Sequence, residues 1–359
     1  MLRQPWKGSG RLAAMTRTTL AVRIERHGGP GVLAEREIPL PDPEPGEVHL
    51  RTQAVGVNFA DLMMRAGIYS TVPPMPYSPG FEVAGVVARV GAEVTEWHEG
   101  DRAIALIRHG GYAHDLIVPT RNLFACPASL SPAEAAAVPV AFLTAWVCLF
   151  DAGNGKRGET ALVLNAAGGV GSAAVQLAVQ AGLRVFGTAG AARKRQFVTG
   201  QLGAAACFDT GGNWEAEVLA AGGARCLDVA LDALGGAATG SCRRLLAPLG
   251  RLVFYGLSDA MPGWRQNWLA MAGAWLKTPR FHPLSLIEPN IGVFGVHLLH
   301  LQAREEILRT RLEQIYQLVL DGAVRPVLDR TFSLDRAGAV AAHEYLHGRQ
   351  VIGKVVLTV

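Results

Sequence analysis

Cysteine is scarce and scattered in this chain. The 359 residues include five cysteines, Cys126, Cys148, Cys207, Cys226 and Cys242, and no two of them have the spacing of a C-x-x-C pair. Disulfide frameworks and structural zinc lobes both need clustered cysteines. The pattern therefore predicts a reduced protein without either feature, and we expect a cytoplasmic location.

The net charge of the chain is small, and its uncharged apolar runs are short. The formal net charge is +4, with 18% charged and 50% hydrophobic residues, which is typical of a globular protein and does not suggest a nucleic-acid binder. The longest uncharged apolar run, residues 135–150, contains Pro139 and is too short to span a bilayer, so we predict no transmembrane segment. Residues 1–18 are basic and aperiodic, and we interpret them as a disordered lead-in outside the fold.

Residues 161–171 combine a short apolar run with a glycine-rich turn. Residues 161–164 are typical of a buried strand, and Gly168, Gly169 and Gly171 follow at the start of a segment with helical spacing. Glycine lets a ligand approach the backbone, and a helix N-terminus points N–H groups at an anion. The turn therefore predicts a pyrophosphate site, although Asn165 stands where the dinucleotide fingerprint has its first glycine. A tight turn in an unrelated α/β protein is the alternative.

The next strand, within residues 182–190, bears on which dinucleotide binds. A site selective for NAD places Asp or Glu at the end of this strand, where it accepts hydrogen bonds from the ribose. Here the strand ends in Thr188, and Arg193 and Lys194 follow. Because cations suit a 2′-phosphate, we predict NADPH as the cofactor. The alternative is that both cations are solvated charges at a helix start.

The order of the predicted elements divides the chain into two domains. Short strands separated by Pro and Gly in the first part are typical of a small β-barrel. A helix start at Ser131-Pro-Ala-Glu134 then leads into six apolar runs with helical segments between most of them, which predicts a doubly wound parallel sheet. We predict a barrel domain from residues 19–140 and 298–359, and a Rossmann nucleotide domain from residues 141–297.

Several motifs, in order along residues 19–359, carry a family resemblance. They are Val57-Asn-Phe-Ala-Asp61, Arg65-Ala-Gly-Ile-Tyr69, Pro79-Gly-Phe-Glu-Val-Ala-Gly85, Ala166-Ala-Gly-Gly-Val-Gly171, Leu231-Asp-Ala-Leu-Gly-Gly236 and Ile352-Gly-Lys-Val-Val-Leu357. With them the chain resembles the zinc-independent quinone oxidoreductases of the medium-chain dehydrogenase/reductase superfamily. Leu149-Phe-Asp-Ala-Gly-Asn154 and Phe294-Gly-Val-His-Leu298 resemble its subgroup of vesicle amine-transport membrane protein homologues. The resemblance implies a GroES-like barrel beside the Rossmann domain, and a homodimer.

The same resemblance implies a reaction without a catalytic metal. Zinc-dependent relatives have a Cys ligand at the position of Asn58 and a His ligand at the position of Phe81. Without such ligands, no zinc polarises an alcohol. Hydride transfer from NADPH to a quinone or an α,β-unsaturated carbonyl is therefore expected, with a small, apolar, electron-poor substrate. Tyr69 aligns with a Tyr that donates a proton or binds the oxyanion in related enoyl-thioester reductases, or else only lines the pocket.

The family correspondence also implies the cofactor contacts. Asn58 bonds the nicotinamide ribose or the substrate carbonyl, or caps a helix, and Lys354 matches a basic residue near the phosphates or ribose. Tyr69 and Asn58 are the expected catalytic residues, and no metal site is expected. Asp61 and Glu82 lie in matching motifs, but a structural salt bridge is at least an equal expectation for each. The expected cofactor-binding residues are Asn58, Thr144, Ala167, Gly168, Gly169, Val170, Gly171, Thr188, Arg193, Lys194, Tyr255, Gly256, Phe294, Val296 and Lys354.

Two alternatives to a quinone or enone reductase stay open. One is an enoyl-thioester reductase. The other is an NADPH-binding scaffold or regulatory protein with vestigial catalysis, which the resemblance to the vesicle-protein subgroup allows. Trp264, Trp268 and Trp275 place an aromatic face on a predicted helix, which we interpret first as core or dimer packing, and otherwise as a lid over a bulky acceptor or a surface for a partner.

Overall fold

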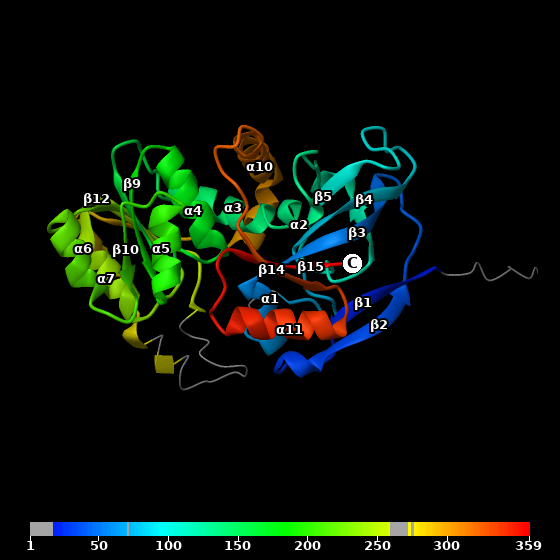
Figure 1. The fold of residues 1–359 in the computed structure, drawn as a ribbon, viewed down its shortest axis with the longest axis horizontal. Helices are drawn as coiled ribbons and strands as arrows, with labels where there is room; N and C mark the ends of the chain where they lie inside the picture. Colours follow the sequence, from blue (N-terminus) through cyan, green and yellow to red (C-terminus); the bar gives the residue numbers. More distant parts are fainter. Residues whose placement is uncertain (1–16, 70–71, 259–271, 274–275) are drawn as a thin grey trace, which may run out of the picture.

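The computed structural model describes residues 17–69, 72–258, 272–273 and 276–359. Its ribbon has two lobes with a helical layer between them (Figure 1). Trp264, Trp268 and Trp275 lie outside the described residues, as do residues 1–16. The aromatic face and the lead-in therefore stay predictions.

One lobe is a six-stranded sheet in which every strand runs parallel to its neighbours. The strand order is β10-β9-β8-β11-β12-β13, with α4 and α5 on one side of the sheet and α6 and α7 on the other (Figure 1). This confirms the predicted doubly wound sheet. The order reverses between β8 and β11, and in such sheets ligands bind outside the carboxyl ends of the strands at that point. The elements are β8 (Thr160–Val163), α4 (Gly169–Gln180), β9 (Arg184–Ala189), α5 (Ala192–Gly200), β10 (Ala206–Asp209), α6 (Trp214–Gly222), β11 (Leu227–Asp232), α7 (Ala237–Leu245), β12 (Leu246–Phe254), α9 (Pro283–Ile287) and β13 (Gly292–Gly295).

The other lobe is built around a seven-stranded sheet. Its strand order is β14-β15-β3-β4-β5-β7, with β6 also paired to β3, and β1 and β2 form a separate two-stranded sheet. In β15, Val355 pairs antiparallel with Val57 of β3, so segments from the early and the late part of the sequence build this lobe. Its elements are β1 (Thr18–Ile24), β2 (Leu33–Pro39), β3 (Glu47–Val57), α1 (Phe59–Ala66), β4 (Glu82–Val90), β5 (Arg102–Leu106), β6 (Asp115–Pro119), β7 (Leu123–Ala125), α10 (Glu305–Leu320), β14 (Leu328–Ser333), α11 (Arg336–His347) and β15 (Lys354–Thr358).

A helical stretch joins the two lobes. It runs through α2 (Pro132–Ala135) and α3 (Pro139–Trp146) into a π-helical segment, Val147–Ala152. The predicted start is confirmed, because Glu134 Oε2 accepts a hydrogen bond from the Ser131 N–H at 2.9 Å and the Ser131 hydroxyl accepts one from the Glu134 N–H at 3.3 Å. Pro139 lies in the first turn of α3, where the missing N–H leaves no bond unmade.

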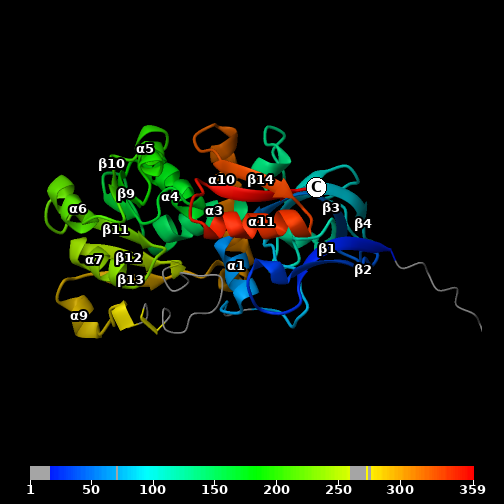
Figure 2. The ribbon, with the colours of Figure 1, turned by 60° about the horizontal axis from the view of Figure 1, so that its bottom comes forward.

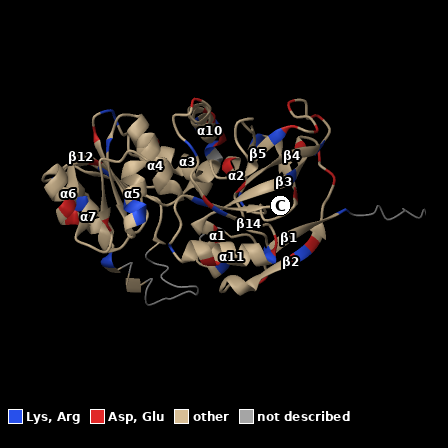
Figure 3. Ribbon diagram, in the orientation of Figure 1, with Lys and Arg blue, Asp and Glu red and all other residues tan. Residues whose placement is uncertain are grey.

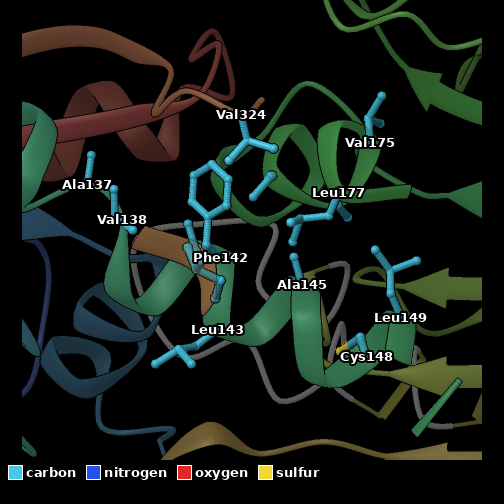
Figure 4. Packing of buried hydrophobic residues seen from close by; sticks show 14 of the residues in the cluster. Ala137, Val138, Phe142, Leu143, Ala145, Cys148, Leu149, Val175, Leu177 and Val324 are labelled. Carbon is cyan, nitrogen blue, oxygen red and sulfur yellow. The ribbon is translucent and has the colours of Figure 1, made fainter. Parts of the chain in front are cut away.

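The whole stretch Pro132–Ala152 has 21 residues and is long and apolar enough to cross a membrane by length and composition. The uncharged run, residues 135–150, lies within this stretch, and the helix also includes the charged residues Glu134 and Asp151 that flank the run. Most of the stretch is buried inside the structure. Phe142 belongs to one core cluster with Leu177 of α4 and Val324, and Figure 4 shows these side chains together. Burial between the lobes is sufficient to explain the apolar composition.

Candidate functional site

The glycine-rich turn lies between β8 and α4, beside the point where the strand order reverses. Asn165 has φ 54°, the left-handed conformation that glycine adopts freely and that Asn tolerates better than most residues. Its carbonyl oxygen accepts a hydrogen bond from the Gly168 N–H at 2.9 Å. A Cβ on Gly171 would lie 2.2 Å from the same oxygen, so this position needs glycine. Asn165 therefore supplies the backbone geometry of the glycine that the fingerprint lacks.

Only part of this turn is accessible to a ligand. Asn165 is exposed and Gly168, Gly169 and Val170 are half-buried, whereas Ala167, Gly171 and Thr188 are buried. The Thr188 hydroxyl accepts a hydrogen bond from the Asn165 N–H at 3.3 Å, so Thr188 supports the turn from behind. Since α4 begins at Gly169, its first N–H groups have no intrahelical partner and suit an anion. The accessible backbone of the turn thus fits a pyrophosphate.

The two cations predicted to bind a 2′-phosphate lie at the start of α5, which is the basic segment marked on that helix in Figure 3. Arg193 donates a hydrogen bond to the carbonyl oxygen of Gln350 at 2.5 Å, and Lys194 Nζ donates one to that of Arg349 at 2.8 Å. Lys194 is buried, and burial, with a smaller effect of Arg193, lowers its pKa. Lys194 is therefore no solvated surface charge. Both side chains connect the nucleotide lobe to the loop before β15.

A buried network of hydrogen bonds surrounds Glu82 at the start of β4. Glu82 is fully buried; its Oε1 accepts hydrogen bonds from Lys354 Nζ at 2.6 Å and Asn58 Nδ2 at 2.9 Å, and its Oε2 accepts one from the Val140 N–H at 2.7 Å. Lys354 Nζ also donates to Asn58 Oδ1 at 2.7 Å and to the Val57 carbonyl at 3.1 Å. These contacts use all the N–H donors of the ammonium group. The salt bridge expected for Glu82 is thus present, with Lys354 as its partner.

This network determines what Asn58 and Lys354 can offer a cofactor. Asn58 precedes α1, and its N–H donates to Asp61 Oδ2 at 2.7 Å, so it is the cap of that helix. A Cβ on Gly169 would lie 2.9 Å from Cδ of Lys354, which places the lysine stem against the glycine-rich turn. The ammonium group itself is bound to Glu82. A contact between Lys354 and a phosphate would therefore replace one of its present hydrogen bonds.

Asp61 is the second buried carboxyl group of this region. It accepts hydrogen bonds from the N–H groups of Asn58 and Gly80, the latter at 2.8 Å. Burial raises its pKa from the ordinary 3.8 to about 7, since the loss of hydration outweighs both hydrogen bonds. Among the residues that the structure describes, Asp61 forms no ion pair, so the salt bridge considered for it is not found.

Tyr69 and His297 meet where the two lobes face each other. Tyr69 follows α1 and His297 follows β13, and their ring centroids are 5.4 Å apart. The Tyr69 ring also lies 6.2 Å from that of Phe81. Burial, with a smaller effect of Asp61, raises the pKa of Tyr69 to about 12, so its phenol is protonated at neutral pH and can donate a hydrogen bond. His297 was not among the predicted site residues, although it lies in a motif used for the family resemblance.

The remaining predicted contacts lie at neighbouring strand ends and in α3. Tyr255 and Gly256 follow β12, Phe294 lies in β13, and Val296 follows β13 and donates its N–H to the Phe254 carbonyl at 2.7 Å. Because β12 and β13 are parallel neighbours, these residues share the carboxyl edge of the sheet with the glycine-rich turn. Thr144 is buried in α3.

Comparisons of the sequence with protein families and with known proteins point to one family. Residues 44–128 match the alcohol dehydrogenase GroES-like domain and residues 202–357 match a family described as zinc-binding dehydrogenase. The chain is 37% identical over 314 residues to the zebrafish (Danio rerio) synaptic vesicle membrane protein VAT-1 homolog, covering 87% of this chain and 64% of that protein. The chain belongs to the medium-chain dehydrogenase/reductase superfamily. The predicted resemblance is therefore confirmed, while the chain spans less than two thirds of the length of this relative.

Solved structures of the medium-chain superfamily agree with the fold. The human VAT-1 homolog-like protein superimposes with a TM-score of 0.81 at 31% identity, covering 95% of this chain and 98% of that chain. A quinone oxidoreductase from Thermus thermophilus was solved alone and in complex with NADPH. It superimposes with a TM-score of 0.76 at 35% identity, covering 95% of this chain and 100% of that chain.

The name of the matched family raises the question of zinc in this medium-chain dehydrogenase/reductase. Asn58 and Phe81, at the positions where zinc-dependent relatives have their Cys and His ligands, carry an amide and a benzene ring, and neither is a thiolate or an imidazole. Within the described part of the chain, no group of three or more His, Cys, Asp or Glu residues is arranged to hold a metal ion. The amide of Asn58 is bound instead to Glu82 and Lys354.

Proposed function

We propose that this medium-chain dehydrogenase/reductase uses NADPH to reduce a quinone or an α,β-unsaturated carbonyl without zinc. The observation that carries the proposal is the position of Tyr69, half-buried between the lobes and beside Phe81. A neutral phenol there can stabilise a developing oxyanion in the place where zinc-dependent relatives use a metal. The likeness to a quinone oxidoreductase solved with NADPH supports the same reaction.

NADPH, when bound, supplies the hydride. The half-buried backbone of Gly168, Gly169 and Val170 would hold the pyrophosphate at the N-terminus of α4. Arg193 and Lys194 would hold the 2′-phosphate, exchanging their hydrogen bonds to backbone carbonyls for stronger ones to phosphate oxygens. Thr144, Tyr255, Gly256 and the main-chain groups of Phe294 and Val296 are the proposed contacts of the nicotinamide end.

Tyr69 would act on the acceptor. Its raised pKa keeps the phenol protonated until negative charge develops on the carbonyl or quinone oxygen, and the phenol then donates its hydrogen bond or its proton to that oxygen. Asn58 would orient the neighbouring groups through the Glu82 network rather than as a free amide.

The proposal includes a homodimer. β13 is one of the two edge strands of the described six-stranded sheet, and Figure 2 shows this side of the nucleotide lobe with α9 beside it. Phe294 on β13 and Leu284 and Ile287 on α9 are exposed. Edge strands with exposed apolar side chains pair readily with another chain. Sedimentation velocity measures the state directly, and a monomer at micromolar concentration would contradict this part of the proposal.

The reaction is tested by following NADPH absorbance with para-benzoquinone, an ortho-quinone, an alkenal and a crotonyl thioester. We expect oxidation that resists a chelator, and the best acceptor distinguishes quinone, enone and enoyl-thioester chemistry. NADPH binding, seen as fluorescence quenching, without turnover of any acceptor would refute the reductase and favour an NADPH-binding scaffold.

The cofactor assignment is tested by Lys194→Glu. A carboxylate in this position repels the 2′-phosphate, so we expect the preference for NADPH over NADH to fall about tenfold or more, which corresponds to about 1.4 kcal/mol. Lys156→Glu is the matched control, because Lys156 is exposed and precedes β8, at the other end of the sheet. An unchanged NADPH/NADH ratio in Lys194→Glu would show that the assignment is wrong.

A further inference from the structure

His297 is half-buried, and the proposed reaction gives its imidazole no role. Both of its ring nitrogens are buried, and neither has a hydrogen-bond partner among the residues that the structure describes. Buried polar atoms nearly always have a partner, and leaving one without costs about 1–3 kcal/mol. An imidazole kept in this state is suited to bind a ligand.

The surroundings of His297 place it at the junction of the lobes. The ladder between β12 and β13 continues to Val296, so His297 is the next residue after the carboxyl end of the sheet. Leu298 packs against the core cluster that contains α3, and Leu299 packs against the core of the barrel lobe. The His297 ring faces Tyr69 at an interplanar angle of 36°. The imidazole and the phenol therefore come from different lobes to one place.

The charge state of His297 follows from what surrounds it. Burial lowers its pKa, and His300, whose ring centroid is 4.2 Å away, lowers it further. The ring is therefore neutral at pH 7, with one N–H donor and one acceptor nitrogen. A neutral imidazole donates a hydrogen bond well but is a poor proton donor, because losing the proton would leave an imidazolate.

We propose that His297 is a second catalytic hydrogen-bond donor, which binds the carbonyl or quinone oxygen of the acceptor together with Tyr69. This inference rests on the proposed function and adds a residue to the same site. Two neutral donors directed at one oxygen form an oxyanion site, which stabilises charge that develops only as the reaction proceeds.

For an enone, the hydride and the proton go to different atoms. A C–H bond forms at the β-carbon with the hydride of NADPH, which is oxidised to NADP⁺. The π electrons of the C=C bond move toward the carbonyl and leave negative charge on its oxygen. That oxygen takes the phenolic proton of Tyr69, the resulting phenolate is reprotonated by water, and His297 keeps its proton throughout. The enol then loses this proton to water and takes one at the α-carbon, which gives the saturated carbonyl. With a quinone, the carbon that received the hydride loses its other proton to water and the second quinone oxygen takes a proton from water, which gives the aromatic hydroquinone.

The test uses the full chain loaded with NADP⁺ and para-nitrophenol as the probe, since its phenolate resembles the oxyanion and its absorbance reports binding. We expect His297→Phe, which retains an aromatic ring, to raise the Kd of the phenolate roughly tenfold to a hundredfold. The same variant should lower kcat for para-benzoquinone by a similar factor and leave the Kd of NADPH unchanged. His297→Gln, whose amide can donate, should recover most of both losses. His98→Phe is the control for the loss of an exposed imidazole away from the site, and both values should stay near those of the wild type.

The outcomes separate this inference from the proposed function. Equal phenolate binding and kcat in the wild type and His297→Phe would overturn it, as would equal losses in His297→Phe and His297→Gln, which indicate a packing role. A wild type that does not bind the phenolate would overturn it as well. Binding that depends on His297 in a protein that oxidises no NADPH would support the donor site and refute the reductase.

Discussion

The substitution Glu82→Gln is expected to destabilise the protein strongly. Glu82 is fully buried and supplies the negative charge beside Lys354, which is itself only 5% exposed. Neutralising it leaves a buried ammonium group without its counter-charge, which typically costs about 3–5 kcal/mol. An amide also has one acceptor oxygen where the carboxylate uses two, so the Val140 N–H or the pair formed by Lys354 and Asn58 loses its acceptor.

Scanning calorimetry measures this effect. At roughly 2–4 °C per kcal/mol for a domain of this size, the melting temperature should fall by about 10 °C. The control is Glu99→Gln, an exposed carboxylate, for which a change within about 0.5 kcal/mol is expected. Because the Lys354 stem lies against Gly169 in the turn, Glu82→Gln should also weaken NADPH binding, measured by fluorescence quenching.

A double-mutant cycle shows whether the charge pair is the cause. Lys354→Met alone leaves the Glu82 carboxylate unpaired, whereas the double variant removes both buried charges. We expect the double variant to be more stable than the sum of the single losses predicts, by about 1–3 kcal/mol. A melting temperature within about 1 °C of the wild type for Glu82→Gln, or strictly additive losses, would refute the reasoning.

Three further expectations concern single residues. Tyr69→Phe should lower kcat by about 100-fold or more, with the Kd of NADPH unchanged, and steady-state kinetics with an unchanged kcat would reduce Tyr69 to a pocket wall. Asn165→Ala should have a lower melting temperature than Asn165→Gly, because φ 54° suits Gly but not Ala, and the difference in stability should be about 1–2 kcal/mol. Equal melting temperatures would contradict the assigned strain. Since burial raises the pKa of Asp61 from 3.8 to about 7, the folded protein holds a proton there that the unfolded chain releases, so stability is full below pH 3.8 and is lost as pH rises toward 7. In the wild type, melting experiments should therefore show a loss of stability of about 4 kcal/mol as pH rises through this range, and Asp61→Asn should remove most of this loss. An unchanged dependence of stability on pH in Asp61→Asn would count against the raised pKa of Asp61.

Most of the fold follows from local patterns in the sequence. The apolar run before the glycine-rich turn predicts β8, and the Ser-Pro-x-Glu sequence predicts the start of α2, because both signals lie within a few neighbouring residues. A count of uncharged residues alone underestimates the length of the central helical stretch. The reason is that the helix also includes Glu134 and Asp151, which are charged residues at the ends of a buried segment.

The site depends on contacts that no local pattern contains. Glu82 collects donors from Asn58, Val140 and Lys354, which lie on three separate elements, so the resemblance could suggest a salt bridge but not its partner. Likewise, the role proposed for His297 depends on its ring contact with Tyr69, a residue of the other lobe. Asn165 departs from the fingerprint in sequence but not in backbone conformation, because the sequence does not show the sign of φ.

The pairing of β15 with β3 also sets an order for folding during synthesis. Lys354 follows Glu82 by 272 positions, so at about 5–20 residues per second the ribosome makes the counter-charge of Glu82 roughly half a minute after Glu82 itself. The six-stranded sheet, from β8 to β13, is synthesised within that interval. The nascent barrel lobe meanwhile keeps an uncompensated carboxylate and an open edge on β3 at residues 54–57, and such an edge can pair with other chains until β15 is made.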